Sequence, residues 1–461
     1  MNKKLVALAV AGAFALPVAA QAQTANVTLY GRLNIDFEFV KGRTCAAATA
    51  PIAGAPGTAA GCNVGLATES TQNTTVNRLS SNSSRFGMRG TESLGGGLNA
   101  IFQIESSING DTNAGNLGGR ETFVGLQGSW GKATFGRFLM PEDDLHPIFG
   151  NAPTLTTSIL STAALWAQGP LNKAQGGFDA RTGNSLRYDS PNWSGFTAAL
   201  QYSTRDSSGD TQNFVSCTPP VTNPQQVGCS ALAPSGTSAQ GGDNGNHVSE
   251  LRHANVVGGN VIYANGPWNA GIAFERNNKV RQYAVTGGNF NASDTDWTIT
   301  GAYDFGTIMQ GFGLRLGLVY ERTKYETKCA TVAGVTTGGC DLKRNFWGVS
   351  GTVPVGGGKV YLFYGRANDG SGSAADGETV GGLVKGPSTK SDQWEASYSY
   401  SLSPRTLLYA GYVKLNNECN AKYSFNINGY TINTAHNVSS AATVPCNGKP
   451  SGAIFGIVHF F

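Results

Sequence analysis

Long hydrophobic runs are the first thing that this sequence lacks. Beyond the N-terminal residues, no stretch approaches the roughly 20 apolar residues that a membrane-spanning helix needs. Charge is also scarce, since charged residues make up 13% of the 461 positions and the formal net charge is only +4. That near balance argues against nucleic acid as a partner. A disordered chain is excluded as well, because 40% of the residues are hydrophobic and 10% are aromatic.

The N-terminus holds the one compact apolar run. Lys3 and Lys4 precede apolar residues 5–15, and the sequence AQA at positions 20–22 has the small-x-small pattern of a cleavage site. We predict that residues 1–22 are a cleaved secretory signal peptide and that residues 23–461 form a single domain. An uncleaved membrane anchor is the alternative, but the run is shorter than a spanning helix requires.

The eight cysteines lie in Gly-, Ala-, Thr- and Asn-rich stretches between strand-like runs. An even number of cysteines in an exported chain favours disulfides, and the spacing favours local pairs. The predicted pairs are Cys45–Cys62, Cys217–Cys229, Cys329–Cys340 and Cys419–Cys446. Metal binding is the alternative, but no C-x-x-C motif or nearby histidine accompanies any pair. We therefore predict no metal and no cofactor.

Apolar and polar residues alternate along most of the remaining chain. In residues 27–39, Leu29 and Leu33 belong to an apolar face, whereas Arg32 and Asp36 belong to a polar one. A soluble β-sandwich would bury the apolar face in protein. A membrane barrel would turn that face to lipid and line its lumen with the polar face.

About sixteen such runs occur, which is an even number, as in bacterial barrels. Seven short and eight long connections separate them, one of the long ones being residues 277–294, and all four cysteine pairs lie in long connections. We predict an all-β fold: a 16-stranded antiparallel transmembrane β-barrel with short periplasmic turns and long outer loops. The runs begin near Val27, Arg78, Leu98, Glu121, Ala133, Ser185, Phe196, Val248, Trp268, Asp296, Gly313, Lys343, Lys359, Gln393, Thr406 and Gly452.

The third long connection, residues 138–184, differs from the others. It carries the acids Glu142, Asp143 and Asp144, and its middle part, residues 153–166, is apolar enough to favour burial and a short helix. A connection of this length with an apolar segment seldom stays in solvent. We expect it to fold into the barrel lumen and to narrow it.

Several arginines alternate with apolar residues or flank a strand. An arginine that faced lipid at the bilayer midplane would cost about 2–4 kcal/mol, so we expect these side chains to face the lumen. Opposite the acidic loop, they would create a transverse field across a narrow aqueous slot that favours small ions and polar solutes. Ordinary lumen charges without a constriction are the alternative. The predicted basic wall consists of Arg32, Arg85, Arg120, Arg181 and Arg187.

Short motifs along the whole chain resemble one known family. They are VTLYGR at 27–32, SRFGMRGTE at 84–92, FVGL at 123–126, FGR at 135–137, NSLRY at 184–188 and GIVHFF at 456–461. Each is weak alone, but their order and spacing resemble the Gram-negative general diffusion porins, most closely the neisserial and other β-proteobacterial type. Val458, where such chains often carry a basic residue, and the many cysteines are departures from the family pattern.

The resemblance implies a homotrimer in the outer membrane, with the third loop folded inward as an eyelet. It places Arg32, Arg85, Arg120 and Arg181 on the basic wall. It also implies acids on the third loop, for which the nearest candidates are Glu142, Asp143 and Asp144, with Asp179 behind them. Phe461 is the expected signal for the barrel assembly machinery, and outer-membrane lipid and lipopolysaccharide are the expected surroundings.

We therefore predict a water-filled channel for passive diffusion of small hydrophilic solutes and ions, with a weak-to-moderate anion preference. A substrate-specific channel is the main alternative, because several tryptophans are available for an aromatic track. An outer-membrane hydrolase is less favoured: His146 lies near Asp144, but no G-x-S-x-G motif accompanies it. We expect no enzyme activity.

Overall fold

The computed structural model describes residues 26–41, 75–112, 114–149, 158–167, 177–204, 254–308, 311, 313–380, 383–418, 420–421, 423–425 and 449–461. The predicted signal peptide, residues 1–22, lies outside these residues. So do three of the predicted cysteine pairs, Cys45–Cys62, Cys217–Cys229 and Cys419–Cys446. Within the described part of the chain, no helix combines the length and the apolar character needed to cross a membrane.

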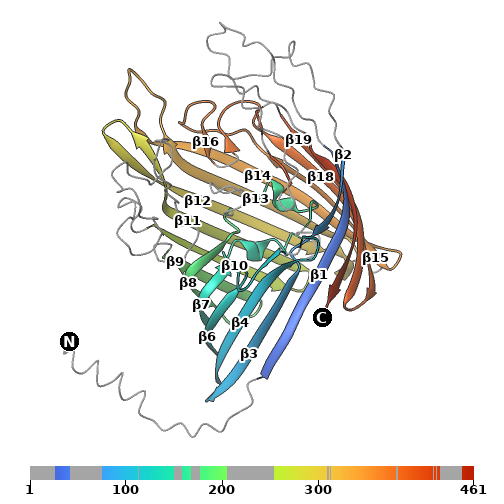
Figure 1. Ribbon diagram of the computed structural model, residues 1–461. Coiled ribbons are helices and arrows are strands. Elements are labelled where there is room, and N and C mark those ends of the chain that lie inside the picture. Colours follow the sequence, from blue (N-terminus) through green and yellow to red (C-terminus); the bar gives the residue numbers. More distant parts are fainter. Residues whose placement is uncertain are drawn as a thin grey trace, which may run out of the picture.

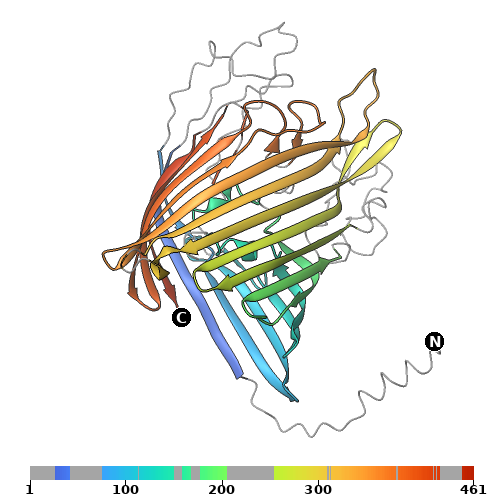
Figure 2. The same ribbon diagram turned by 180° about the vertical axis from the view of Figure 1, so that it is seen from behind.

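Antiparallel strands form a closed ring (Figures 1 and 2). The last strand, β20, pairs with β1 from Phe460 opposite Arg32 to Ser451 opposite Lys41, which closes the barrel. The main sheet has eighteen strand segments at sixteen barrel positions, because β2 and β3 both pair with β1, and β5 and β6 both pair with β4. The predicted 16-stranded antiparallel barrel is confirmed.

The strand bounds agree closely with the alternating runs of the sequence. The strands are β1 (Asn26–Lys41), β2 (Thr75–Ser81), β3 (Arg85–Gly95), β4 (Leu98–Asn109), β5 (Ala114–Asn116), β6 (Thr122–Gly128), β7 (Gly131–Leu139), β8 (Arg181–Asp189), β9 (Phe196–Ser203), β10 (Asn255–Asn265), β11 (Trp268–Val285), β12 (Gly288–Asp304), β13 (Arg315–Lys328), β14 (Gly338–Val355), β15 (Gly358–Ala367), β18 (Ser391–Ser403), β19 (Thr406–Asn417) and β20 (Ser451–Phe460). A small hairpin, β16 (Thr379–Val380) and β17 (Leu383–Val384), lies in the connection between β15 and β18.

One predicted connection is wrong. Residues 277–294 do not form a long loop, because β11 and β12 extend for 18 and 17 residues and meet in a tight turn between Val285 and Gly288. Polar residues on both faces of this hairpin hide the alternation that marks the other strands. Its backbone groups pair with each other across the strands, and Arg281 adds an ion pair with Asp294. The hairpin therefore stays paired up to its turn despite its polar sequence, with one irregularity in register between Asn277 and Arg281.

The two faces of the wall are chemically opposite. Apolar side chains point outward, and Leu29 and Leu318 keep 61% and 64% of their surface exposed. On β1 the alternate residues Asn34, Asp36 and Glu38 are buried inside the barrel. The outer face suits lipid and the inner face suits water, which is the arrangement that the alternation predicted.

The predicted disulfide Cys329–Cys340 is present. It joins the end of β13 to the start of β14, so it closes the connection between these two strands. At the C-terminus, the backbone of Phe461 exchanges two hydrogen bonds of 3.1 Å with Gly31, which continue the pairing of β20 with β1.

Candidate pore constriction

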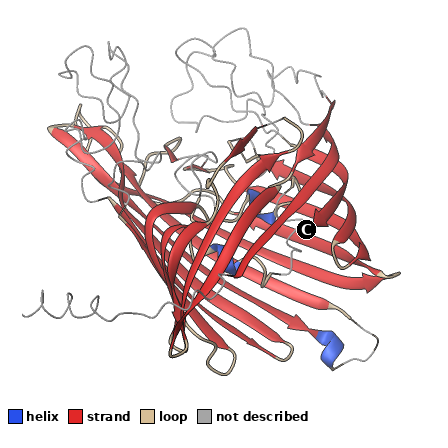
Figure 3. Ribbon diagram, turned by 60° about the horizontal axis from the view of Figure 1, so that its bottom comes forward, coloured by secondary structure: helices blue, strands red, loops and turns tan. Residues whose placement is uncertain are grey.

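The connection between β7 and β8, residues 140–180, is called the third loop below. Its described parts include two short 3-10 turns, η1 (Asp143–Leu145) and η3 (Thr162–Ala164), and both turns lie inside the ring of strands (Figures 1 and 3). The helix expected from the sequence would begin near residue 153, and residues 150–157 lie outside the described part.

Inward-facing side chains of three strands bind the third loop. On β13, the Arg315 guanidinium donates to the carbonyl of Ile148 at 2.9 Å, and Glu321 accepts from the backbone N–H of Ala167 at 2.6 Å. On β14, the Ser350 hydroxyl donates to the carbonyl of Phe149, and on β18 the Gln393 amide donates to the carbonyl of Ser161 at 3.0 Å. The loop is thus held against the inner face of β13, β14 and β18.

Apolar contacts support the same placement. The side chains of Ile159, Leu160 and Trp166 are completely buried. A Cβ atom built on Gly411 of β19 would lie 2.7 Å from Leu160, and one built on Gly452 of β20 would lie 2.6 Å from Ile159. Glycine at these two positions therefore permits the loop to approach the wall this closely.

Four of the predicted wall arginines lie near one another. Arg32 and Arg85 are directly opposite each other on β1 and β3. Glu105 of β4 forms ion pairs with both Arg120, at 2.5 Å, and Arg85, at 3.4 Å. The charges of Arg120 and Arg85 also act on Arg181 at the start of β8. These residues, Arg32, Arg85, Arg120 and Arg181, are called the four wall arginines below.

A break in the wall positions Arg32. The chain leaves the sheet between β2 and β3, where Ser83 has a positive φ of 52°. The break turns the carbonyl groups of Asn82 and Ser83 toward Arg32, whose guanidinium donates to them at 3.5 and 3.3 Å. The arginine is thus held at the wall by backbone oxygens.

Arg187 of β8 lies elsewhere. Its guanidinium pairs with Asp144 of the third loop at 2.6 Å and with Asp189 at 2.8 Å. Asn260 of β10 donates a further hydrogen bond to Asp144 at 2.9 Å. Arg187 therefore ties the start of the third loop to the wall instead of lining a surface with the four wall arginines.

The remaining loop acids surround His146. The imidazole stacks on Trp166 with ring centres 4.0 Å apart, and its Nε2 lies 3.4 Å from Glu142 and 3.9 Å from Asp179. Burial alone would lower the pKa of His146, but the charges of Glu142, Asp143 and Asp179 outweigh it and raise that pKa to about 9. Burial raises the pKa of Asp143 to about 6 and that of Asp179 to about 7.

Sequence reasoning missed a buried charged group beneath the loop. Carboxylate oxygens of Glu142, Asp296 and Glu321 all lie within 4.8 Å of one another, and Arg344 forms a buried ion pair with Glu321. The alternation does place Asp296 and Glu321 on polar faces. It gives no indication that an acid of the third loop would be brought onto them.

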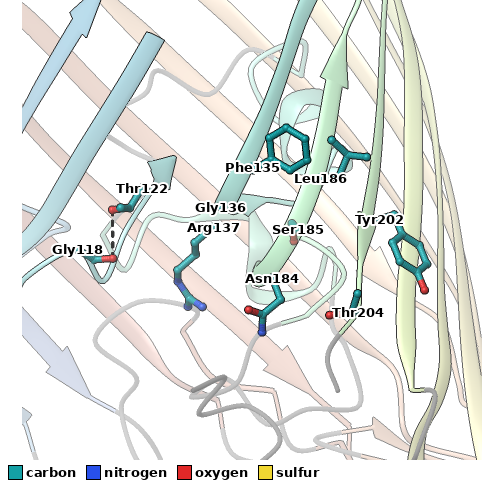
Figure 4. A pocket seen from close by; sticks show the side chains of 10 residues that line it. All are labelled: Gly118, Thr122, Phe135, Gly136, Arg137, Asn184, Ser185, Leu186, Tyr202 and Thr204. Atoms are coloured by element: carbon teal, nitrogen blue, oxygen red, sulfur yellow. Dashed lines mark hydrogen bonds between the residues drawn. The ribbon is translucent and has the colours of Figure 1, made fainter. Parts of the chain in front are cut away.

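A separate pocket lies over β7, β8 and β9 (Figure 4). Its lining includes the exposed outer-face residues Phe135, Leu186 and Tyr202, and Arg137 and Asn184 lie close to them. None of the predicted wall or loop residues lines this pocket. It is therefore distinct from the candidate constriction.

A closed barrel with an apolar outside and a charged inside is a transmembrane pore protein. The chain belongs to the Gram-negative porin family, whose sequence profile matches residues 7–420. The protein is accordingly an outer-membrane channel for passive diffusion, as the alternating strands and the motifs predicted.

Individual relatives agree with this assignment. Outer membrane porin protein 32 of Delftia acidovorans is 28% identical over 432 residues, which cover 91% of this chain and 90% of the relative. An outer membrane porin protein of Bordetella pertussis is 28% identical over 352 residues, covering 71% and 76%. The structure of an anion-selective porin from Comamonas acidovorans has the same fold, with a TM-score of 0.58 and 23% identity over 95% of this chain and all of that one.

Proposed function

We propose that this porin prefers anions and that its narrowest part lies between the four wall arginines and the third loop. The proposal is supported by the number of carboxylates that neutralise the wall arginines and by the partners that neutralise the acids of the third loop. On the wall, Glu105 pairs with both Arg85 and Arg120. The charge of Glu121 acts on Arg85 and Arg181, so four arginines face two wall carboxylates. The positive charge of the wall therefore exceeds the negative charge placed against it.

The loop acids are engaged by partners of their own. Asp144 pairs with Arg187, and Glu142 and Asp179 face the ring of His146. The charge of Asp143 acts on His146 and on Arg181. Their field across the lumen is correspondingly weaker than that of the wall. In water, one charge acts on an ion 4 Å away with about 1 kcal/mol, which is roughly a fivefold change in local ion concentration. Such an excess produces the weak-to-moderate anion preference proposed here.

Charge-neutralising variants test the proposal. Arg85→Gln and Arg120→Gln should each lower the chloride-to-potassium permeability ratio, measured from the reversal potential of the purified porin in a planar bilayer. Arg405→Gln removes the same charge from an exposed short turn and serves as the matched control. Unchanged reversal potentials in both wall variants would remove the wall from the account of selectivity.

The tryptophans favour a general channel over a substrate-specific one. An aromatic track for a sugar would have to line the lumen. Instead, Trp193, Trp268, Trp297 and Trp394 are each more than half exposed on the outer face, and Trp166, in the third loop itself, is completely buried. Such outer aromatics suit the interfacial girdles of a barrel. We therefore propose small hydrophilic solutes and ions as the solutes that pass.

We propose no catalytic role for the protein. His146, the histidine considered as a base, contacts carboxylates and an aromatic ring among the described residues. His146→Ala should leave lipase, esterase and protease assays of the purified porin at the background level of the wild type. Wild-type hydrolysis that this variant loses would establish an enzyme.

The remaining proposals concern assembly. We propose a homotrimer, which the family resemblance supports, and conductance steps that occur in threes would reveal it. We also propose removal of residues 1–22, and recognition of the exposed terminal Phe461 by the barrel assembly machinery in a membrane of lipid and lipopolysaccharide. Mass spectrometry of the mature N-terminus and the membrane yield of a Phe461→Ala variant test these two points.

A further inference from the structure

We infer that Asp143, His146 and Asp179 form a binding site for a divalent transition-metal ion of the zinc class. The site would join the two ends of the third loop. It goes beyond the diffusion channel, and it runs against the expectation from the sequence that the chain binds no metal.

Local structure brings the three residues together. Asp143 starts the 3-10 turn η1 and His146 follows its end, three positions later. Side chains three positions apart eclipse each other on a 3-10 helix, so both lie on one side of the turn. Asp179 comes from the returning end of the loop, which a hydrogen bond of 3.0 Å from the Met140 N–H to the Ala180 carbonyl holds against the outgoing end.

The distances between donor atoms suit a small metal ion. One ligand atom from each residue lies within 4.8 Å of the other two, and His146 Nε2 is 3.9 Å from Asp179 Oδ2. Zinc binds imidazole nitrogen and carboxylate oxygen at about 2.0–2.2 Å, which places the donors of a tetrahedral site about 3.4 Å apart. A contraction of about 1 Å, within reach of rotation of the side chains, would complete the three-ligand set.

The state of His146 is the second observation that points to a ligand. Its side chain is 9% exposed, and its Nε2 has no hydrogen-bond partner among the described residues. The carboxylates of Glu142 and Asp179, at 3.4 and 3.9 Å, are too far away for a good hydrogen bond. The nitrogen is balanced by the nearby carboxylates but makes no good hydrogen bond, and a metal ion that displaces its proton would bind it together with the carboxylates.

The donor set also indicates which metal to expect. Calcium and magnesium prefer oxygen donors alone and take six or more of them. One imidazole with two carboxylates matches zinc, and the partial exposure of Asp143 and Asp179 leaves room for a water molecule as fourth ligand. We therefore expect zinc to bind more tightly than calcium or magnesium.

The stack of His146 on Trp166 gives a direct optical probe. A copper ion bound at His146 would lie close to the indole ring and should quench its fluorescence. The experiment uses the full-length, tag-free porin purified in detergent and freed of metal with a chelator. Zinc binding is measured by titration calorimetry, and copper binding by quenching of tryptophan fluorescence. Neither readout needs a current, so their failure would leave the proposed anion preference untouched.

Conservative variants make the test specific. Asp143→Asn, Asp179→Asn and His146→Gln should each weaken zinc binding by at least about tenfold, since even residues outside a ligand shell have effects of that size. His459→Gln, which alters an exposed histidine of β20, is the matched control and should leave binding unchanged. Circular dichroism verifies that each variant retains its β-structure, and Asp143→Asn and Asp179→Asn change only one oxygen each.

The expected result is one zinc ion per chain in the wild type, with weaker binding in all three site variants. Saturable binding that the two asparagine variants leave unchanged would place the metal elsewhere and overturn the inference. Absence of saturable zinc binding in the wild type would overturn it as well.

Discussion

Replacing Gly411 by valine should release the third loop from the barrel wall. A Cβ at this position would lie 2.7 Å from the Leu160 side chain and 2.8 Å from the Cβ of Ser397. The contact with Leu160 is the one that undocking of the loop relieves, whereas the contact with Ser397, on the neighbouring strand β18, is the same in the docked and undocked states. Overpacking of this kind costs about 1–3 kcal/mol, which corresponds to roughly a fivefold to hundredfold shift from the docked toward the undocked loop.

Single-channel conductance in a planar bilayer measures the effect. If the loop narrows the lumen, Gly411→Val should show a higher mean conductance with larger fluctuations than the wild type. Gly351→Val is the matched control, because a Cβ at Gly351 meets no atom closer than 3.7 Å. A folded Gly411→Val porin with wild-type conductance and noise would show that the docked loop does not limit the pore.

Two further predictions concern stability. Arg344→Ala should lower the free energy of unfolding by about 3–5 kcal/mol, because it leaves the completely buried Glu321 without its cation. Urea unfolding in detergent measures this loss. If the second change Glu321→Gln restored none of it, the buried ion pair would not be the cause. The double variant Cys329→Ser, Cys340→Ser should be cleaved faster by proteases in the connection between β13 and β14, with unchanged conductance. The reason is that a disulfide stabilises mainly by restricting its own loop. Equal cleavage rates in the oxidised wild type and the variant would show that the disulfide does not protect this connection.

Much of the barrel could be predicted from the sequence because its wall is built from a local signal. Along each strand, side chains point alternately to lipid and to the lumen. The exposed Leu29 and the partly buried Tyr30 are one such neighbouring pair. The prediction failed where that signal is absent. In the hairpin of β11 and β12, beyond Asn277, both faces are polar, and only the pairing between the strands reveals the ribbon.

The candidate site could be predicted only in part. The arginines stand out because lipid excludes them, and the loop acids stand out because they follow a strand directly. Contacts across the lumen leave no such mark. Nothing in the sequence pairs Asp144 with Arg187, which lies 43 positions away. Likewise, the need for glycine at position 411 becomes clear only from its close contact with Leu160 of the third loop.

An excess of positive charge on the arginine wall should govern which ions pass. The reversal potential of the wild-type porin under a potassium chloride gradient tests it most directly. We expect a potential that corresponds to chloride permeating more readily than potassium. This preference should diminish at about 1 M salt, where the Debye length falls to about 3 Å. A clear preference for potassium in low salt would show that the wall arginines do not govern ion selectivity.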